Sequence, residues 1–122
     1  MGLIVQKYGG TSVADPDRIH AVADNVAITR RRGDDVIVVV SAMGKATDNL
    51  ISLADRVSRT QPGREMDMLL TTGERQTAAL MTMALADRGI EAVSYTGSQV
   101  GIITDTAHRK AKILEVKGDR VR

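Results

Sequence analysis

The alternation of apolar and polar stretches divides this chain into strand-like and helix-like segments. Residues 3–8 form a short apolar run that ends at two glycines, and residues 36–40 form an unbroken β-branched run. Both runs are typical of buried strands in a parallel sheet, and the second predicts a central strand covered on both faces. Further strand candidates are residues 92–95, 100–104 and 112–116.

The segment between the first two strands predicts an amphipathic helix. Apolar residues recur at helical spacing from Ile19 to Ala27. Asp15 followed by Pro16 predicts an N-cap and the first helical position. A run of three arginines and then Gly33 predicts the end of the helix.

Two more helical stretches follow the second strand. Leu50, Leu53 and Val57 predict one helix, which we expect Thr47 or Asp48 to cap. The other runs from about residue 64 to residue 88, with a break expected at 71–73 and Gly89 after its end. We expect its methionines to fill the core; they are Met66, Met68, Met81 and Met83.

The order β-α-β-α-α-β-β-β predicts an α/β fold with a parallel core. Residues 118–122 have the pattern of a turn followed by the first turn of another helix. We therefore expect the sequence to be truncated.

Composition narrows the class of protein. The 122 residues are 43% hydrophobic and 26% charged, which predicts one compact soluble unit. With 17 basic and 15 acidic side chains and only two tyrosines as aromatics, we expect no nucleic-acid partner. There is no cysteine, no apolar run long enough to span a membrane and no signal-peptide pattern, so we expect a cytoplasmic protein with no membrane partner.

The loop after the first strand has the chemistry of an anion site. Ligands of open parallel sheets bind at the carboxyl ends of strands. Lys7 supplies a positive charge there, and Gly9 and Gly10 let the backbone approach a phosphate closely. A glycine turn that merely ends the strand explains the same residues, and both interpretations stay open.

The loop after the second strand begins at Ser41 and leads into a helix start rich in hydroxyl and amide groups. That helix start consists of Lys45, Ala46, Thr47, Asp48 and Asn49. An anion or a polar substrate suits such a place, and we expect ordinary helix capping in addition.

Other polar residues carry weaker signals. Glu74 follows the expected helix break, where the helix dipole favours a carboxylate; binding of a substrate ammonium group is the alternative, and the residues favour the dipole. We expect His20 to be exposed, and His108 alone is weak evidence for catalysis. The sequence has no Walker A motif, no G-x-G-x-x-G and no metal-ligand cluster, so we assign no metal ligand to it.

Taken in order, these motifs resemble the aspartate kinases of the amino-acid kinase superfamily over essentially the whole chain. The matching segments are Lys7-Tyr8-Gly9-Gly10-Thr11-Ser12-Val13, Val39-Val40-Ser41-Ala42-Met43-Gly44, Leu69-Leu70-Thr71-Thr72-Gly73-Glu74-Arg75, Thr96-Gly97-Ser98-Gln99-Val100-Gly101-Ile102-Ile103-Thr104-Asp105, and His108 with Ala111 and Ile113. The resemblance implies a three-layer α/β fold with a mostly parallel sheet flanked by helices.

The resemblance also implies a reaction and its partners. These are ATP-dependent phosphorylation of the side-chain carboxylate of L-aspartate, with Mg²⁺, at the entry to lysine, threonine and methionine biosynthesis. Lys7, Tyr8, Gly9, Gly10 and Ser41 would contact the phosphoryl groups of ATP, with Lys7 catalytic. Residues 45–49 and Glu74 would hold the aspartate, with Glu74 pairing to its ammonium group.

Aspartate kinases continue into a second half with most of the nucleotide and magnesium site, and then into regulatory ACT domains. We therefore expect residues 1–122 to be the N-terminal portion of the catalytic domain, inactive alone, prone to self-association, and oligomeric in the full-length protein. Two alternatives remain: another carboxylate or carbamate kinase of the superfamily, and a non-catalytic module that binds an anion or a larger subunit.

Overall fold

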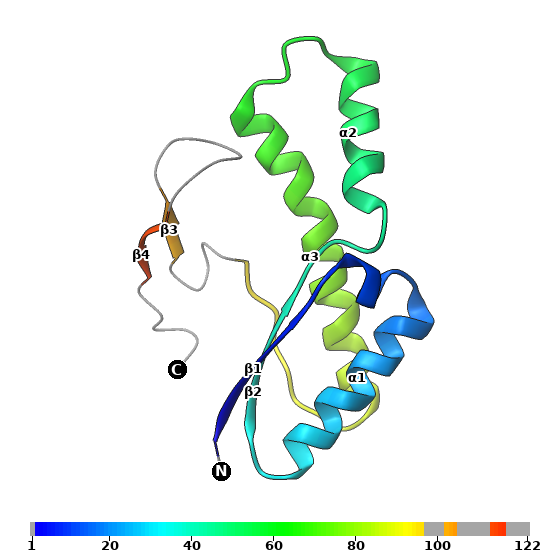
Figure 1. The fold of residues 1–122 in the computed structure, drawn as a ribbon, viewed down its shortest axis with the longest axis vertical. Coiled ribbons are helices and arrows are strands. Elements are labelled where there is room, and N and C mark those ends of the chain that lie inside the picture. Colours follow the sequence, from blue (N-terminus) through cyan, green and yellow to red (C-terminus); the bar gives the residue numbers. More distant parts are fainter. Residues whose placement is uncertain (1, 97–101, 105–112, 117–122) are drawn as a thin grey trace.

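The computed structural model describes residues 2–96, 102–104 and 113–116 (Figure 1). Its elements are β1 (Leu3–Tyr8), the short 3₁₀ helix η1 (Gly10–Val13), α1 (Pro16–Arg31), β2 (Asp35–Val40), α2 (Ala46–Val57), α3 (Gly63–Asp87), β3 (Ile102–Thr104) and β4 (Ile113–Val116). β1 and β2 pair in parallel through the crossover helix α1, and β3 and β4 pair antiparallel. The described part of the chain is therefore α/β, as the sequence predicts.

The ends of α1 follow the sequence signals closely. The side chain of Asp15 accepts a 2.9 Å hydrogen bond from the backbone N–H of Arg18, and Pro16 is the first helical residue. Gly33 adopts a φ of 97° just after the helix, a conformation open to glycine but costly for other residues. The predicted start and stop of this helix are confirmed.

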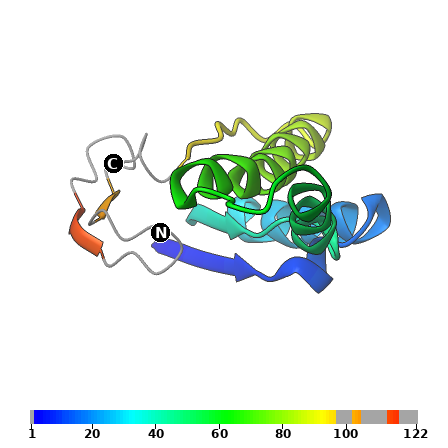
Figure 2. The same ribbon diagram turned by 90° about the horizontal axis from the view of Figure 1, so that it is seen from above.

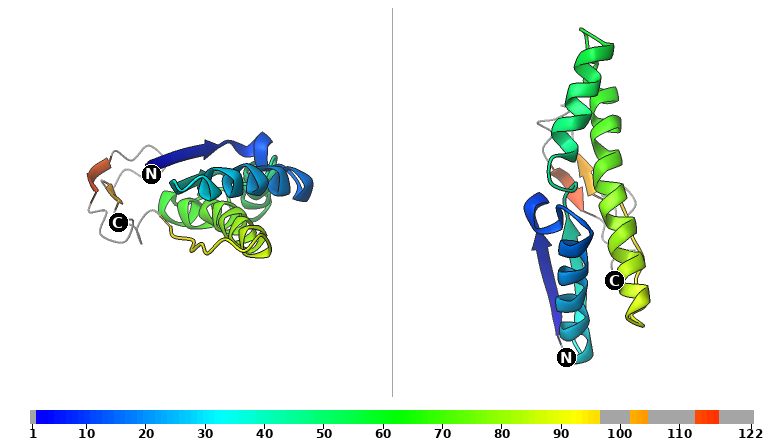
Figure 3. Two further views of the ribbon diagram at one scale, coloured as in Figure 1. Left: turned by 90° about the horizontal axis from the view of Figure 1, so that it is seen from below. Right: turned by 90° about the vertical axis from the view of Figure 1, so that its right-hand side faces the viewer.

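Helices cover one face of the β1–β2 pair. Even-numbered residues of both strands, such as Tyr8, Val38 and Val40, pack against the core between the strands, α1 and α3. The buried side chains of that core are Val13, Ile19, Val22, Ala23, Val26, Met81, Ala84 and Leu85. Figure 2 shows β1 on the side of the molecule away from α3, and Figure 3 shows α1 and α3 side by side.

The other face of the same two strands is largely exposed to solvent. Leu3 is 66% exposed, Val5 61% and Val39 45%. The prediction that β2 is buried on both faces is therefore wrong, because the helices that contact these strands in the described residues pack on one side. Alternation along a strand then leaves every second apolar side chain uncovered.

Two further sequence predictions need correction. Residues 92–95 form no strand, because no strand among the described residues pairs with them. Met66 and Met81 are buried as predicted, but Met68 and Met83 are exposed, since two residues along a helix leads to its opposite side. Of the last two predicted strands, residues 102–104 and 113–116 are strands, and residues 100, 101 and 112 lie outside the described part.

Candidate functional site

The loops that follow β1 and β2 meet at the carboxyl ends of the strands. Tyr8 lies opposite Val40 in the parallel register, so both strands end at the same edge. The backbone N–H of Gly44 donates a 2.9 Å hydrogen bond to the carbonyl oxygen of Gly10. The structure therefore brings the Gly9-Gly10 loop and the loop of residues 41–44 into direct contact.

The two glycines of the first loop have different surroundings. A Cβ atom added to Gly10 would lie 3.0 Å from the carbonyl oxygen of Ala42, closer than side chains normally come. A Cβ atom added to Gly9 would meet nothing within 4 Å. Gly10 thus permits close packing of the two loops, while Gly9 leaves its backbone open to a ligand.

Lys7 and Tyr8 lie on opposite faces of the sheet. The Tyr8 hydroxyl donates a 2.7 Å hydrogen bond to Gln6 Oε1 and accepts a 2.8 Å bond from Asn25 Nδ2 of α1. The Tyr8 side chain therefore packs in the α1 layer, which no local pattern in the sequence indicated. Lys7 is exposed on the opposite face, where α1 does not reach.

The helix after Ser41 begins without the expected side-chain cap. α2 starts at Ala46, and its N-cap residue Lys45 makes no capping hydrogen bond, so the capping prediction for Thr47 or Asp48 is wrong. The backbone itself makes the turn: Gly44 has a φ of 48°, and the Ala46 N–H donates a 2.8 Å bond to the carbonyl of Met43. The residues expected to hold the substrate thus form the N-cap and the first turn of α2, where Lys45, Asp48 and Asn49 are exposed and Ala46 and Thr47 are half-buried.

Glu74 lies in the middle of α3, not at a helix start. The break predicted at residues 71–73 is wrong, because α3 runs without interruption from Gly63 to Asp87. The hydroxyls of Thr71 and Thr72 donate hydrogen bonds of 2.9 and 2.7 Å to carbonyls one turn earlier, which accommodates them within the helix. The helix dipole therefore does not explain the exposed Glu74 carboxylate, because that effect is confined to helix ends.

Gly73 brings α3 against the loop of residues 41–44 and against α2. A Cβ atom added to Gly73 would lie 3.0 Å from Ala42 Cβ, 3.5 Å from Leu50 Cδ1 and 4.0 Å from Ala46 Cβ. This contact sets Glu74 beside the segments that carry Ser41 and Thr47. Sequence reasoning missed it, although a glycine inside a helical pattern is a known signal of close packing.

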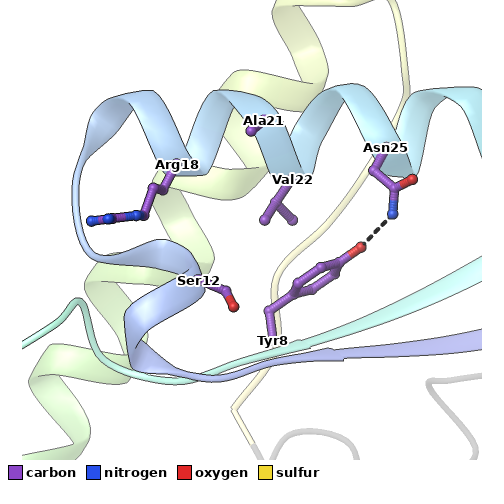
Figure 4. Close-up of a pocket in the computed structure, with 6 residues that line it drawn as sticks. All are labelled: Tyr8, Ser12, Arg18, Ala21, Val22 and Asn25. Atoms are coloured by element: carbon purple, nitrogen blue, oxygen red, sulfur yellow. Dashed lines mark hydrogen bonds between the residues drawn. The ribbon is translucent and has the colours of Figure 1, made fainter.

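The described residues also form a hollow of about 330 Å³ between β1, η1 and α1 (Figure 4). Its lining consists of Tyr8, Ser12, Arg18, Ala21, Val22 and Asn25. Arg18 forms a 3.1 Å salt bridge with Asp15 there. Neither Lys7, Ser41 nor Glu74 lines this hollow, whereas Tyr8, one of the predicted phosphate-contacting residues, does.

The remaining polar candidates add no metal site. Within residues 2–96, 102–104 and 113–116, no three His, Asp or Glu side chains gather as metal ligands would. His20 is exposed, as predicted, and lies 3.2 Å from an Arg88 guanidinium nitrogen. His108 and residues 98–101 lie outside the described part of the chain.

Comparison with known proteins identifies the family of this chain. The model of the amino acid kinase family matches residues 2–122. The chain belongs to this family. It is 55% identical over 122 residues to an aspartokinase of Mycolicibacterium smegmatis and 54% identical over 121 residues to one of Bacillus sp. strain MGA3, covering 100% and 99% of this chain.

A solved structure of this amino acid kinase family extends the match to the fold. The aspartate kinase from Synechocystis is 53% identical and superposes with a TM-score of 0.78, over 82% of this chain and 17% of that one. The chain spans 29% of the length of each of the two curated relatives. Among the helices that the structure describes, none is both long enough and apolar enough to cross a bilayer.

Proposed function

We propose that this chain is part of an aspartate kinase, which transfers the γ-phosphoryl group of ATP to the side-chain carboxylate of L-aspartate and forms 4-phospho-L-aspartate. The observation that carries the proposal is the meeting of three segments at one sheet edge: the Gly9-Gly10 loop, residues 41–44 and α3 at Gly73. The similarity to aspartokinases of two organisms supports it.

The roles within the proposal follow the positions of the residues. Lys7, with the backbone of Tyr8, Gly9 and Gly10, contacts the transferring phosphoryl group, and Ser41 contacts the nucleotide phosphates. Residues 45–49, with Thr47 among them, and Glu74 hold the aspartate, and Glu74 pairs with its ammonium group. The close approach of α3 to the first turn of α2 supports a shared substrate site for Glu74 and Thr47.

These residues suit the chemistry of the reaction. The attacking carboxylate is already an anion, so no general base has to create the nucleophile. The difficulty is to bring two negative groups together and to neutralise the charge on the phosphoryl group in flight. A lysine, backbone N–H groups and accurate positioning supply this, and a catalytic histidine or cysteine is not needed.

ATP and Mg²⁺ are the cofactors of the proposed reaction. The absence of a side chain at Gly9 suits a phosphate group, because a Cβ atom placed there would have no neighbour within 4 Å and the space on that side of the backbone is open. The described residues offer no cluster of acidic side chains for Mg²⁺. We therefore assign phosphate contacts to this chain and no magnesium ligand, and we derive no step that passes through the metal.

We also propose a pathway, a compartment and an assembly state for the enzyme. The reaction is the first step toward lysine, threonine and methionine. We place it in the cytoplasm, in an oligomer of the full-length protein, with no nucleic-acid or membrane partner. The even charge balance, with a net charge of +2, supports the absence of a nucleic-acid partner.

A substrate screen on the full-length protein tests the function. ADP release with MgATP is expected with L-aspartate and not with L-glutamate or N-acetylglutamate. Turnover of one of the latter in place of aspartate would assign a different carboxylate kinase of the family. Absence of turnover with all three, together with co-purification of a larger kinase subunit, would assign a binding module.

The same assay on residues 1–122 alone tests whether this part carries a complete ATP site. We expect no ADP release above a blank without protein. Aspartate-dependent release by the purified chain would contradict this expectation.

A further inference from the structure

Gly73 occupies a place in α3 where a side chain would be crowded. Its missing Cβ atom would stand 3.0 Å from the Cβ of Ala42, a separation tighter than nine in ten Cβ contacts in proteins. Ala42 is only 5% exposed, and it or α3 would have to shift to admit the new atom. The same added atom would make only ordinary contact with Leu50 and Ala46, at 3.5 and 4.0 Å. Ala42 is thus the single obstacle.

The glycine weakens the helix that contains it. Gly inside a helix costs about 1 kcal/mol relative to Ala. An alanine at this position would therefore stabilise α3 itself, and the close contact with Ala42 opposes that gain. Glycine at this position instead allows α3 to pack closely against Ala42.

Two of the three nearest neighbours of Gly73 lie beside the proposed site. Ala42 directly follows Ser41, and Ala46 directly precedes Thr47. Gly73 itself precedes Glu74. One contact point therefore sets the spacing of three proposed ligand-holding residues on three separate segments.

The loop that carries Ala42 is held from its other side. The backbone of Gly10 packs against the Ala42 carbonyl, and the Gly44 N–H donates its hydrogen bond to Gly10. A side chain on Gly73 therefore pushes α3 away instead of moving the loop. Glu74 would move with α3, while Lys7 and Ser41 would stay in place.

We infer that Gly73 is a positioning residue of the substrate site, which sets the distance of Glu74 from Ser41 and Thr47 by letting α3 contact Ala42. This inference rests on the proposed function, because its readout is the binding of aspartate. Gly73 acts on the part of the site that binds aspartate, whereas the part that binds phosphate depends on the loop after β1.

The test is Gly73→Ala in the full-length protein. We expect the KM for aspartate to rise about tenfold and the KM for ATP to change by less than about twofold, since an ångström-scale shift affects only the ligand held by the displaced group. The melting temperature serves as the measure of folding. Gly2→Ala is the matched control, because a Cβ there would meet only Asp34 Oδ1, at 3.6 Å.

The exchanged pair Ala42→Gly with Gly73→Ala makes the test specific. It removes the obstructing Cβ atom while it adds the new one, so the KM for aspartate should return to within about twofold of wild type if spacing is the cause. A purely structural role would lower the melting temperature without this selective rescue.

Each outcome decides between the claims. An unchanged aspartate KM in folded Gly73→Ala, or an exchanged pair that folds and stays impaired, would overturn the positioning role. If Gly73→Ala does not fold, the exchanged pair alone decides. If wild-type protein fails to phosphorylate aspartate, the proposed function fails first, independently of Gly73.

Discussion

The guanidinium Nε of Arg88 donates a 2.7 Å hydrogen bond to Oδ1 of Asp24, which joins the C-terminal end of α3 to the middle of α1. Other nitrogens of the same side chain bond the carbonyls of Ala84 and His20, at 2.8 and 3.2 Å. The Arg88 side chain is only 18% exposed, whereas that of Asp24 is 66% exposed. Arg88 therefore adds polar contacts between the two helices to the apolar core that they share.

This arrangement predicts unequal effects of the two partners. We expect Arg88→Ala to lower the free energy of unfolding by about 1–3 kcal/mol, because it removes several charge-assisted hydrogen bonds at once. Asp24→Ala should cost less, since Arg88 keeps its bonds to the two carbonyls. Urea denaturation of both variants measures the difference. An equal or larger loss in Asp24→Ala would contradict this account.

The N-cap of α1 predicts a second stability effect. Asp15→Ala should cost about 1 kcal/mol, because the N–H of Arg18 loses its acceptor. Asp15→Asn should retain most of the stability, since the asparagine oxygen can accept the same bond. Thermal unfolding followed by circular dichroism compares the two. If both variants melt together, the cap does not stabilise the helix.

The two glycines after β1 should respond differently to alanine. Gly10→Ala would force its Cβ against the backbone of Ala42, so we expect a lower melting temperature. Gly9→Ala meets no atom within 4 Å, so its fold should be intact while the KM for ATP rises, because the new methyl group fills the space proposed for phosphate. Calorimetry and steady-state kinetics on the full-length protein test both statements. Wild-type ATP kinetics in Gly9→Ala would exclude the phosphate contact.

Lys7 and Glu74 should affect different kinetic constants. Lys7→Met is expected to lower kcat by about 10²–10³-fold, because it removes a charge that acts on the transferring phosphoryl group. Glu74→Gln is expected to raise the KM for aspartate, with a smaller change in kcat, because it removes the partner of the substrate ammonium. A raised aspartate KM in Lys7→Met together with a strongly lowered kcat in Glu74→Gln would contradict these two roles.

The exposed apolar face of β1 predicts self-association of the isolated chain. Leu3 and Val5 are 66% and 61% exposed, and Val39 on the same face of β2 is 45% exposed. Val5→Thr keeps a β-branched residue in the strand while it makes the face more polar, so it should reduce association. Sedimentation velocity measures this. A monodisperse wild-type monomer would contradict the prediction.

Local signals in the sequence predicted the elements well. Asp15-Pro16 and Gly33 mark the ends of α1 because capping and a positive φ depend on neighbouring residues alone. The parallel pairing of β1 and β2 follows from two apolar runs separated by one helix. The Gly9-Gly10 loop and the loop of residues 41–44 were likewise expected at the carboxyl ends of strands, and they lie there.

Contacts between residues far apart in the sequence could not be predicted from local patterns. Thr71, Thr72 and Gly73 look like a helix break when only their neighbours are considered. The helix continues through them because the two hydroxyls bond carbonyls one turn earlier, and Gly73 provides room for Ala42 of another segment. The direction of Tyr8 has the same origin, because its hydroxyl bonds Asn25 on α1. Neither contact leaves a periodic trace in the sequence.

The hydrogen bond between Gly44 and Gly10 joins two loops through backbone atoms alone. No rotamer change can loosen it, and no substitution of a side chain removes the donor except proline. A displacement of one loop that keeps this bond carries the other loop with it, so the proposed contacts of Lys7 and Ser41 to ATP would move together.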